Sequence, residues 1–446
     1  MCDGSGDIED LAPVSQYQNN KTSKTSYNKC KKCEEKPVVL LQKKDPFCKS
    51  CFFEYCNHKF RSTIGKTKRV KHGDKVLIAC SGGRKSTAML HMTKQALDSA
   101  SAKQISFTPG ILYIDETVLS PFISEKIVNS SQDIVCKLEE YGYPVFISLL
   151  EMVCKLNNKE IYWNSSCLKA SDKVPDLESQ NWFQVCMSDM SLSERYDLLK
   201  HMRLLLMTEI ANQMGYHYLF VGDSGNSLAV NLLTDISLGR GSQISSDTSF
   251  YDSRYKVPIC RPIREFLDKE LLIYNHLHGC SYMVNPDLLT KVNPTSCIQK
   301  LTECFVTELQ EQFPATVFTI FRTGGKLSLD SSLLAEEICL ICKSKLDNVD
   351  PDPCSAVEAL KISESVSAVE SSMKEQESNF FTDPSAGFKN MNISNNLCYG
   401  CSTLFRHKKL TGSKMYDFYQ NILRAELEYL NKDIKPLEDE TETVYS

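Results

Sequence analysis

Eight of the 20 cysteines in this 446-residue chain form four Cys-x-x-Cys pairs, and these pairs constrain the fold more than any other feature. Cys30/Cys33 and Cys48/Cys51 are separated by 14 residues. Two such knuckles can present four thiolates tetrahedrally to Zn²⁺. The alternative is a coincidence of free cysteines. We expect a structural zinc module over residues 30–70, which also contains a basic linker.

A second four-thiolate site is predicted near the C-terminus, from Cys339/Cys342 and Cys398/Cys401. The 55 residues between these pairs include ten serines and many acidic side chains, so we interpret residues 343–397 as a flexible insertion. Such an insertion does not prevent the pairs from meeting, because loop-closure entropy grows only logarithmically with length. The C-terminal cysteine module is predicted over residues 331–430.

Between the cysteine modules, residues 71–330 alternate between strand and helix patterns. A β-branched run at 75–80 is followed by a glycine-rich turn and a helical segment at 86–100. Further strands are predicted at 110–115, 144–150 and 218–223. Helices are predicted at 123–141, 194–214 and 264–278, and another follows the 218–223 strand and ends at 238. This alternation indicates an α/β fold with a parallel sheet covered on both faces. Residues 155–193 interrupt the pattern as an irregular insertion.

The turn at the end of the first strand has the composition of an oxyanion site. Ser81, Gly82, Gly83, Lys85 and Ser86 lie where a strand gives way to a helix N-terminus. Glycines allow close backbone approach, and amide and hydroxyl groups can cradle a phosphate. The Walker and dinucleotide-binding spacings are both absent. The alternative is a tight turn with Ser86 as a helix N-cap.

Other strand ends supply candidate partners for this turn. Ligands bind outside the carboxyl ends of parallel strands, so Asp115, Gly222 and Asp223 are predicted to face the same cleft. Each aspartate is also explained as a turn residue or helix cap.

Charge is distributed unevenly along a chain whose net charge is −5. Residues 21–75 contain 16 Lys or Arg and 5 Asp or Glu. We interpret this surface as an RNA-binding candidate beside the nucleotide cleft, although a solvated linker would have the same composition. The candidate residues are Lys59, Arg61, Lys66, Lys68, Arg69 and Lys71.

No stretch reaches the roughly 18 to 20 apolar residues of a membrane span, and the N-terminus lacks a secretory pattern. We therefore predict a cytoplasmic protein that does not contact a membrane. Residues 1–29 are predicted to be a disordered tail, and residues 431–446 an acidic tail.

As an ordered set, these motifs resemble the PP-loop ATP pyrophosphatase superfamily, and within it the cytosolic tRNA 2-thiolation proteins. The resemblance extends from about Cys30 to Cys401, through Ser81-Gly82-Gly83, Gly222-Asp223 and Cys260-Arg261-Pro262. It implies a HUP-like core, also called adenine nucleotide alpha hydrolase-like. The chain looks most like the second, non-catalytic-type subunit of the thiolase complex.

The resemblance also implies a reaction and its partners. ATP with Mg²⁺ activates the wobble uridine 2-oxygen, and sulfur from a thiocarboxylated ubiquitin-like carrier then displaces AMP. The modified tRNAs are those for Lys, Glu and Gln, and the catalytic thiolase subunit is the partner in a heterodimer.

Several departures from the catalytic pattern point to a supporting role. Catalytic relatives read Ser-Gly-Gly-x-Asp-Ser, and Lys85 stands where that aspartate sits. An ammonium cannot ligate Mg²⁺. Cys260 matches one cysteine of the family's catalytic centre and is the candidate catalytic residue here, but Cys167 and Cys186 do not form the expected Cys-x-x-Cys. An autonomous PP-loop ligase acting on tRNA, and a zinc RNA-binding scaffold without enzymatic activity, remain alternatives.

Overall fold

The fold is described from a computed structural model of the chain. The structure describes residues 29–42, 44–99, 105–123, 130–156, 161–165, 177–188, 190–327, 338–346, 360 and 397–406. The predicted tails therefore lie outside the described residues, apart from Lys29, as does most of the predicted insertion at 343–397.

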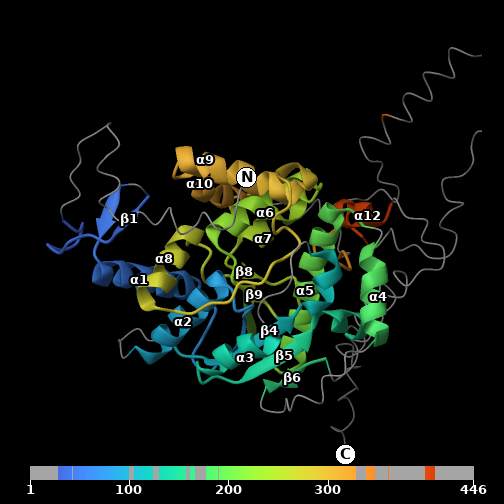
Figure 1. Cartoon of the computed structure of the whole chain (residues 1–446), viewed down its shortest axis with the longest axis horizontal. Coiled ribbons are helices and arrows are strands. Elements are labelled where there is room, and N and C mark those ends of the chain that lie inside the picture. The colour runs from blue at the N-terminus through green and yellow to red at the C-terminus, as the bar shows by residue number, and fades with distance from the viewer. Residues whose placement is uncertain are drawn as a thin grey trace, which may run out of the picture.

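A seven-stranded sheet organises the described part of the chain (Figure 1). Its order is β6-β5-β4-β3-β7-β9-β8, and a separate β1-β2 hairpin precedes it. Neighbours from β5 to β9 pair in parallel, whereas the two edge strands β6 and β8 pair antiparallel. The strands are β1 (Val39–Leu41), β2 (Asp45–Phe47), β3 (Lys75–Ala79), β4 (Thr108–Asp115), β5 (Val145–Leu149), β6 (Trp163–Asn164), β7 (Tyr218–Phe220), β8 (Tyr251–Asp252) and β9 (Ile259–Cys260).

Helices cover both faces of the sheet, which confirms the predicted α/β class. The α-helices are α1 (Lys49–Thr67), α2 (Arg84–Asp98), α3 (Ser131–Glu139), α4 (Leu177–Ser188), α5 (Leu192–Gln213), α6 (Gly225–Ser237), α7 (Ile244–Thr248), α8 (Asp268–His278), α9 (Ile298–Gln312), α10 (Thr316–Gly324) and α12 (Tyr399–Arg406). Short 3₁₀ helices are η1 (Thr117–Phe122), η2 (Leu150–Lys155), η4 (Gly241–Gln243) and η5 (Pro294–Ser296).

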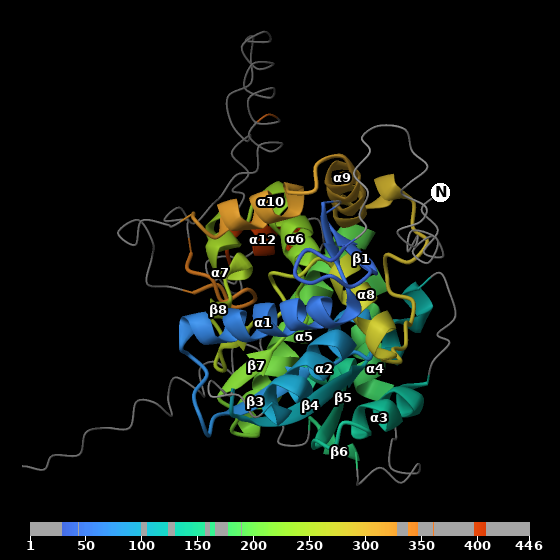
Figure 2. The same ribbon diagram turned by 90° about the vertical axis from the view of Figure 1, so that its left-hand side faces the viewer.

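Two cores form because successive strand residues point to opposite faces. On β3, Val76 and Ile78 pack with α1, α2, α3 and α8, which lie along one side of the sheet in Figure 2. Leu77 packs on the other face with α4 and α5. A third cluster joins α6, α9 and α10. Because β3 is buried on both faces of the sheet, its sequence is a continuous apolar run.

The strand order creates one switch point, between β3 and β7. The chain winds outward from β3 through β4 to β5 on one side, and from β7 to β9 on the other. The connections after β3 and β7 therefore run in opposite directions from the carboxyl edge, which is where ligands bind in open α/β sheets. Residues 81–83 and 221–224 lie at this edge.

Several predicted boundaries differ from the structure. The helix expected at 123–141 begins at Ser131, where Ser130 and Asp133 form a capping box, and residues 124–129 lie outside the described residues. The stretch at 155–193 is not wholly irregular, because α4 buries Trp182 and Phe183 in the core. The helix expected from 264 begins at Asp268.

None of the described helices combines the length and apolar composition needed to cross a bilayer.

Candidate functional site

The turn predicted to hold a phosphate (residues 81–86, the phosphate turn) lies at the carboxyl end of β3 and leads into α2. Gly82 adopts a φ of +76°, and a Cβ there would lie 2.7 Å from Cγ2 of Ile134. A side chain is therefore excluded by both backbone conformation and packing. Ser81 and Arg84 are exposed, so the turn is on the surface and accessible.

The first turn of α2 faces this loop without a side-chain cap. Its N-cap is Gly83, not Ser86, and no side chain donates or accepts there as a cap. The Ser81 and Ser86 hydroxyl oxygens lie 3.3 Å apart. A Cβ added to Gly222 would lie 3.6 Å from the Ser86 amide nitrogen, so the β7 loop lies directly against this turn. Backbone amides and two hydroxyls thus gather at the switch point.

Lys85 does not point into the turn as a free cation. Its ammonium donates to the Ser227 hydroxyl at 2.7 Å and lies 3.8 Å from Oδ2 of Asp268. Asp268 raises the pKa of Lys85, which therefore remains charged. These contacts link the start of α2 to the starts of α6 and α8. Lys85 therefore joins the starts of three helices.

The two aspartates predicted near the turn are already hydrogen-bonded within the protein. Asp115 accepts hydrogen bonds from the Thr117 amide at 2.9 Å, and from the hydroxyls of Thr117 and Ser131 at 2.6 Å each. Asp223 accepts from Nε of Arg261 at 3.2 Å. Both carboxylates lie near the carboxyl edge, but they act as turn and ion-pair residues.

Cys260 ends β9 and is fully buried. Burial raises the pKa of its thiol to about 12, so the nucleophilic thiolate is disfavoured. Cys186 is also buried, and Cys167 lies outside the described residues. Among the described residues, the groups with three or more neighbouring metal-type ligands are the two four-cysteine clusters, and neither includes Cys260.

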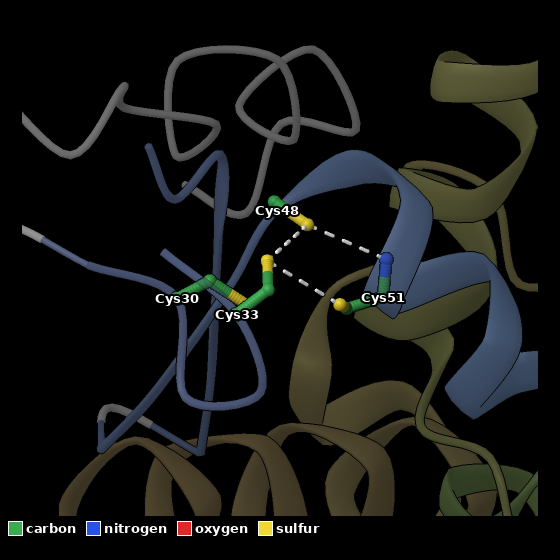
Figure 3. A group of neighbouring side chains, drawn as sticks. All are labelled: Cys30, Cys33, Cys48 and Cys51. Atoms are coloured by element: carbon green, nitrogen blue, oxygen red, sulfur yellow. Dashed lines mark hydrogen bonds between the residues drawn. The ribbon is translucent and has the colours of Figure 1, made fainter. Parts of the chain in front are cut away.

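The N-terminal cluster brings together Cys30, Cys33, Cys48 and Cys51, whose sulfurs all lie within 4.8 Å of one another. Figure 3 shows their side chains converging from the loop before β1 and from the start of α1. Cys33 Sγ lies 3.5 Å from Cys48 Sγ and 3.7 Å from Cys51 Sγ. A tetrahedral zinc site with Zn–S bonds of about 2.3 Å has S–S edges of about 3.8 Å. The four thiols therefore fit Zn²⁺.

The C-terminal cluster consists of Cys339, Cys342, Cys398 and Cys401, also within 4.8 Å of one another. All four are buried, and Cys342 Sγ lies 3.6 Å from Cys398 Sγ. Hydrogen bonds from the other three thiols lower the pKa of Cys339, and the same contacts raise the pKa of Cys398 and Cys401. The pairs thus meet as predicted, although Cys398 follows Cys342 by 56 positions in the sequence.

The predicted basic residues separate into two environments. The Lys59 ammonium is 2.8 Å from Glu270 and 4.6 Å from the centroid of the Phe266 ring. Its side chain is 16% exposed, so its charge is largely used inside the protein. Arg61 is half-buried and has interactions of its own. The other four residues, Lys66, Lys68, Arg69 and Lys71, are exposed.

These four exposed residues lie at the opposite edge of the sheet from the phosphate turn. They precede Lys75, the first residue of β3, whereas the turn follows Ala79. Four residue steps at about 3.3 Å span about 13 Å. The Tyr218 hydroxyl at the start of β7 donates to the Arg69 carbonyl at 3.0 Å and fixes this loop. The expectation that the basic surface adjoins the nucleotide cleft is therefore corrected.

Sequence reasoning missed two residues beside the C-terminal sulfurs, Arg240 and Gln243. They lie between α6 and α7, nearly 100 residues before Cys339. No local pattern links an isolated arginine or glutamine to distant cysteines. The sequence predicts the helix that ends near residue 238, but the loop after it contains no recognisable motif.

Comparisons with known proteins identify the family. A family model described as cytoplasmic tRNA 2-thiolation protein 2 matches residues 297–403. The relative with that name from Xenopus tropicalis is 35% identical over 408 residues, covering 79% of each chain. The Danio rerio relative is 34% identical over 76% of each chain, and the human one 29% identical over 78% of this chain and 77% of its own.

A solved structure resembles the fold. The U34-tRNA thiolase NcsA from Methanococcus maripaludis, solved with its [4Fe-4S] cluster, has a TM-score of 0.52 and 16% sequence identity. The match covers 71% of this chain and 91% of that chain. It confirms the α/β fold with a mostly parallel sheet that the strand and helix pattern predicted. The cytoplasmic location predicted from the sequence is confirmed by the names of the relatives. On these similarities, the chain belongs to the cytoplasmic tRNA 2-thiolation protein 2 family.

Proposed function

We propose that this chain is the supporting subunit of a heterodimeric tRNA thiolase, in which a separate subunit carries out catalysis. Membership of the family supports a role in tRNA thiolation. The observation that carries the finer assignment is Lys85, whose ammonium occupies the metal-ligand position and joins Ser227 and Asp268. Mg²⁺ binds oxygen ligands, so the turn lacks one of the groups that ATP activation requires.

The remaining chemistry of the site agrees with this division of labour. Cys260 is buried and its pKa is raised, so it is a poor sulfur carrier or nucleophile. Ser81, Gly82, Gly83 and Ser86, beside Gly222, would form a residual phosphate cradle. Asp115 and Asp223 support the surrounding loops. In the complex, ATP and Mg²⁺ act on the catalytic subunit, which receives sulfur from a thiocarboxylated ubiquitin-like carrier.

The eight paired cysteines would hold two structural Zn²⁺ ions, which cross-link the chain at both ends of the core. Lys66, Lys68, Arg69 and Lys71 would help dock the wobble-uridine tRNAs for Lys, Glu and Gln. Arg61 lies in the C-terminal half of α1 and would also contact tRNA. Lys59 instead stabilises the interior.

Reconstituted thiolation tests this proposal. Purified tRNA, ATP, Mg²⁺ and the sulfur carrier are incubated with this chain, with the catalytic subunit, and with both, and 2-thiouridine is quantified. We expect product with both subunits, and none from this chain alone. Thiolation by this chain alone would instead support an autonomous ligase. Full activity of the catalytic subunit without this chain would show that this chain is not needed for thiolation. That result would support the alternative of an RNA-binding scaffold without enzymatic activity.

A further inference from the structure

Two core residues direct N–H groups at the C-terminal sulfurs. Gln243 Nε2 lies 3.0 Å from Cys342 Sγ and 3.4 Å from Cys398 Sγ. Arg240 Nη2 lies 3.9 Å from Cys401 Sγ. Gln243 is 2% exposed and Arg240 is 1% exposed, so water does not compete for these contacts. Three of the four sulfurs therefore have a side-chain donor from outside the cysteine module.

The orientation of Arg240 is fixed by its neighbours. Both terminal nitrogens donate to the two carboxylate oxygens of Asp197 on α5. The same guanidinium donates to the Gly400 carbonyl at 3.2 Å. A bidentate arginine–carboxylate pair holds the planar fork in one position. Asp197 thus aims Arg240 at the segment that carries Cys401.

Close packing seats the cysteine segments on this part of the core. A Cβ at Gly400 would lie 2.5 Å from Cγ of Arg240, and one at Gly239 would lie 2.6 Å from the Tyr399 ring. The four cysteines also belong to the same buried cluster as Leu198 and Met202 of α5. The module is therefore part of the α5 face of the core, not an independent finger.

The N-terminal cluster is built differently. Its N–H donors are backbone amides of its own module, from Lys32 to Cys30 Sγ and from Cys51 to Cys48 Sγ, each at 3.4 Å. Cys33 is partly exposed. Four thiolates around a divalent ion keep a net negative charge, which is costly to bury without hydrogen bonds. The buried C-terminal site depends more strongly on such donors than the N-terminal one.

We infer that Gln243 and Arg240 are positioning residues of the C-terminal metal site, and that they make its metal harder to remove than the N-terminal metal. The bound ion in turn ties the two cysteine segments to α5 and to the loop between α6 and α7. This inference rests on the zinc assignment in the proposed function. Its test needs neither tRNA nor a partner subunit, so it can fail while the thiolation proposal stands, and the reverse also holds.

Zinc release from the full-length chain measures this effect. The zinc-loaded protein is mixed with excess chromogenic chelator, and the release of each ion is followed over time. The Cys48→Ser/Cys51→Ser variant lacks the N-terminal site and identifies the slower, C-terminal phase. We expect Gln243→Leu to accelerate that phase about tenfold and to leave the fast phase unchanged, since outer-shell substitutions cost about 10- to 100-fold in metal affinity.

A matched control separates hydrogen bonding from general destabilisation. Gln299 is also buried, and its amide donates to the Ser193 carbonyl at 3.0 Å. Gln299→Leu should leave both phases unchanged. Equal acceleration of both phases by Gln243→Leu, or no acceleration, would overturn the inference. So would a wild-type chain that binds one zinc or none.

A spectroscopic readout does not depend on the release kinetics. Co²⁺ exchanged into the full chain gives sulfur-to-metal charge-transfer absorption. Removing an N–H···S hydrogen bond raises the energy of the sulfur electrons, so Gln243→Leu should shift the C-terminal band to longer wavelength. The double variant Arg240→Met/Asp197→Leu should also shift the C-terminal band to longer wavelength, and by more than Gln243→Leu does. Replacing both partners of the ion pair avoids leaving a buried unpaired charge. Unchanged bands in both variants would contradict the assignment.

Discussion

Lys59 shows how the same residue type serves different purposes at different positions of one helix. Its ammonium is held by Glu270 and by the Tyr55 hydroxyl at 2.9 Å, between α1 and α8. Seven residues later, Lys66 is exposed. The sequence shows only a basic run, because burial depends on which elements pack against the helix. This is why the charge pattern predicted a basic surface but not which residues form it.

The Lys59→Met substitution should destabilise the protein by about 2 to 4 kcal/mol, because it leaves the buried Glu270 carboxylate unpaired. Denaturant unfolding measures this change. The control Lys66→Met removes an exposed charge and should alter stability by less than about 0.5 kcal/mol. Equal effects of the two substitutions would contradict the buried role of Lys59.

His278 should make stability sensitive to mild acid. Its ring stacks on Phe53 at 3.7 Å and lies 4.6 Å from the ring of His91. Burial, His91 and Lys49 lower the pKa of His278 to about 4, below the unfolded value of about 6.5. The unfolded chain therefore binds more protons between these values, so stability is full above pH 6.5 and falls as the pH approaches 4.

Between pH 7 and pH 5 these two pKa values correspond to a loss of about 2 kcal/mol, and we expect about 1 kcal/mol because solvent screens the part-exposed ring. The His278→Phe variant keeps the ring stack but cannot titrate. The difference in unfolding free energy between wild type and variant should therefore change with pH in this window. A difference that stays constant would show that His278 does not titrate as described.

At the scale of elements, the sequence predicted best those segments whose pattern is local. The apolar run at 75–80 correctly predicted β3, and the serine-glycine turn after it correctly predicted the start of α2. The edge strands β6 and β8 were missed, because two residues carry no periodicity and their pairing depends on tertiary contacts. The start of α3 was available from Ser130 and Asp133, whose three-residue spacing is a capping-box signal.

Only part of the candidate site could be predicted, because local motifs can be recognised in a sequence and tertiary contacts cannot. Its turn and cysteine pairs are local motifs, and both assemble as groups. The destination of the Lys85 ammonium depends on Ser227 and Asp268, which are far away in sequence. The position of the basic residues relative to the turn depends on the direction of β3, which separates them by a strand length.

The end of α1 supplies an element-scale prediction about tRNA. Replacing Lys66, Lys68 and Lys71 together by Gln should weaken tRNA binding about tenfold or more at physiological salt, and should reduce the slope of log affinity against log salt by up to about 3. Stability should hardly change, because these side chains are exposed.

Titrations at several salt concentrations measure this slope. Lys326 is also exposed but follows α10, away from this loop in the sequence, so Lys326→Gln is the control. If Lys326→Gln weakens binding as much as the triple variant, the interaction is a general effect of charge. If neither variant changes the slope, tRNA does not dock on this edge.

At the scale of the whole molecule, the chain combines a mostly parallel α/β sheet with a turn that, on the proposed function, lacks the groups for catalysis. The sheet order places the turn at the switch point, where a nucleotide would be expected. At this turn the Lys85 ammonium is held by Ser227 and Asp268, and Cys260 is buried. The fold class followed from patterns in the sequence, whereas the proposed absence of catalysis rests on individual residues within that fold.

Pyrophosphate release from Mg-ATP by this chain alone, in the presence of tRNA, tests whether the proposed absence of catalysis holds. The Gly82→Val variant is the control, because its side chain would clash with Ile134 at a φ of +76° and distort the turn. The account predicts that both proteins release pyrophosphate at the rate of the protein-free background. Mg²⁺-dependent release by the wild-type chain that is abolished in Gly82→Val would contradict it.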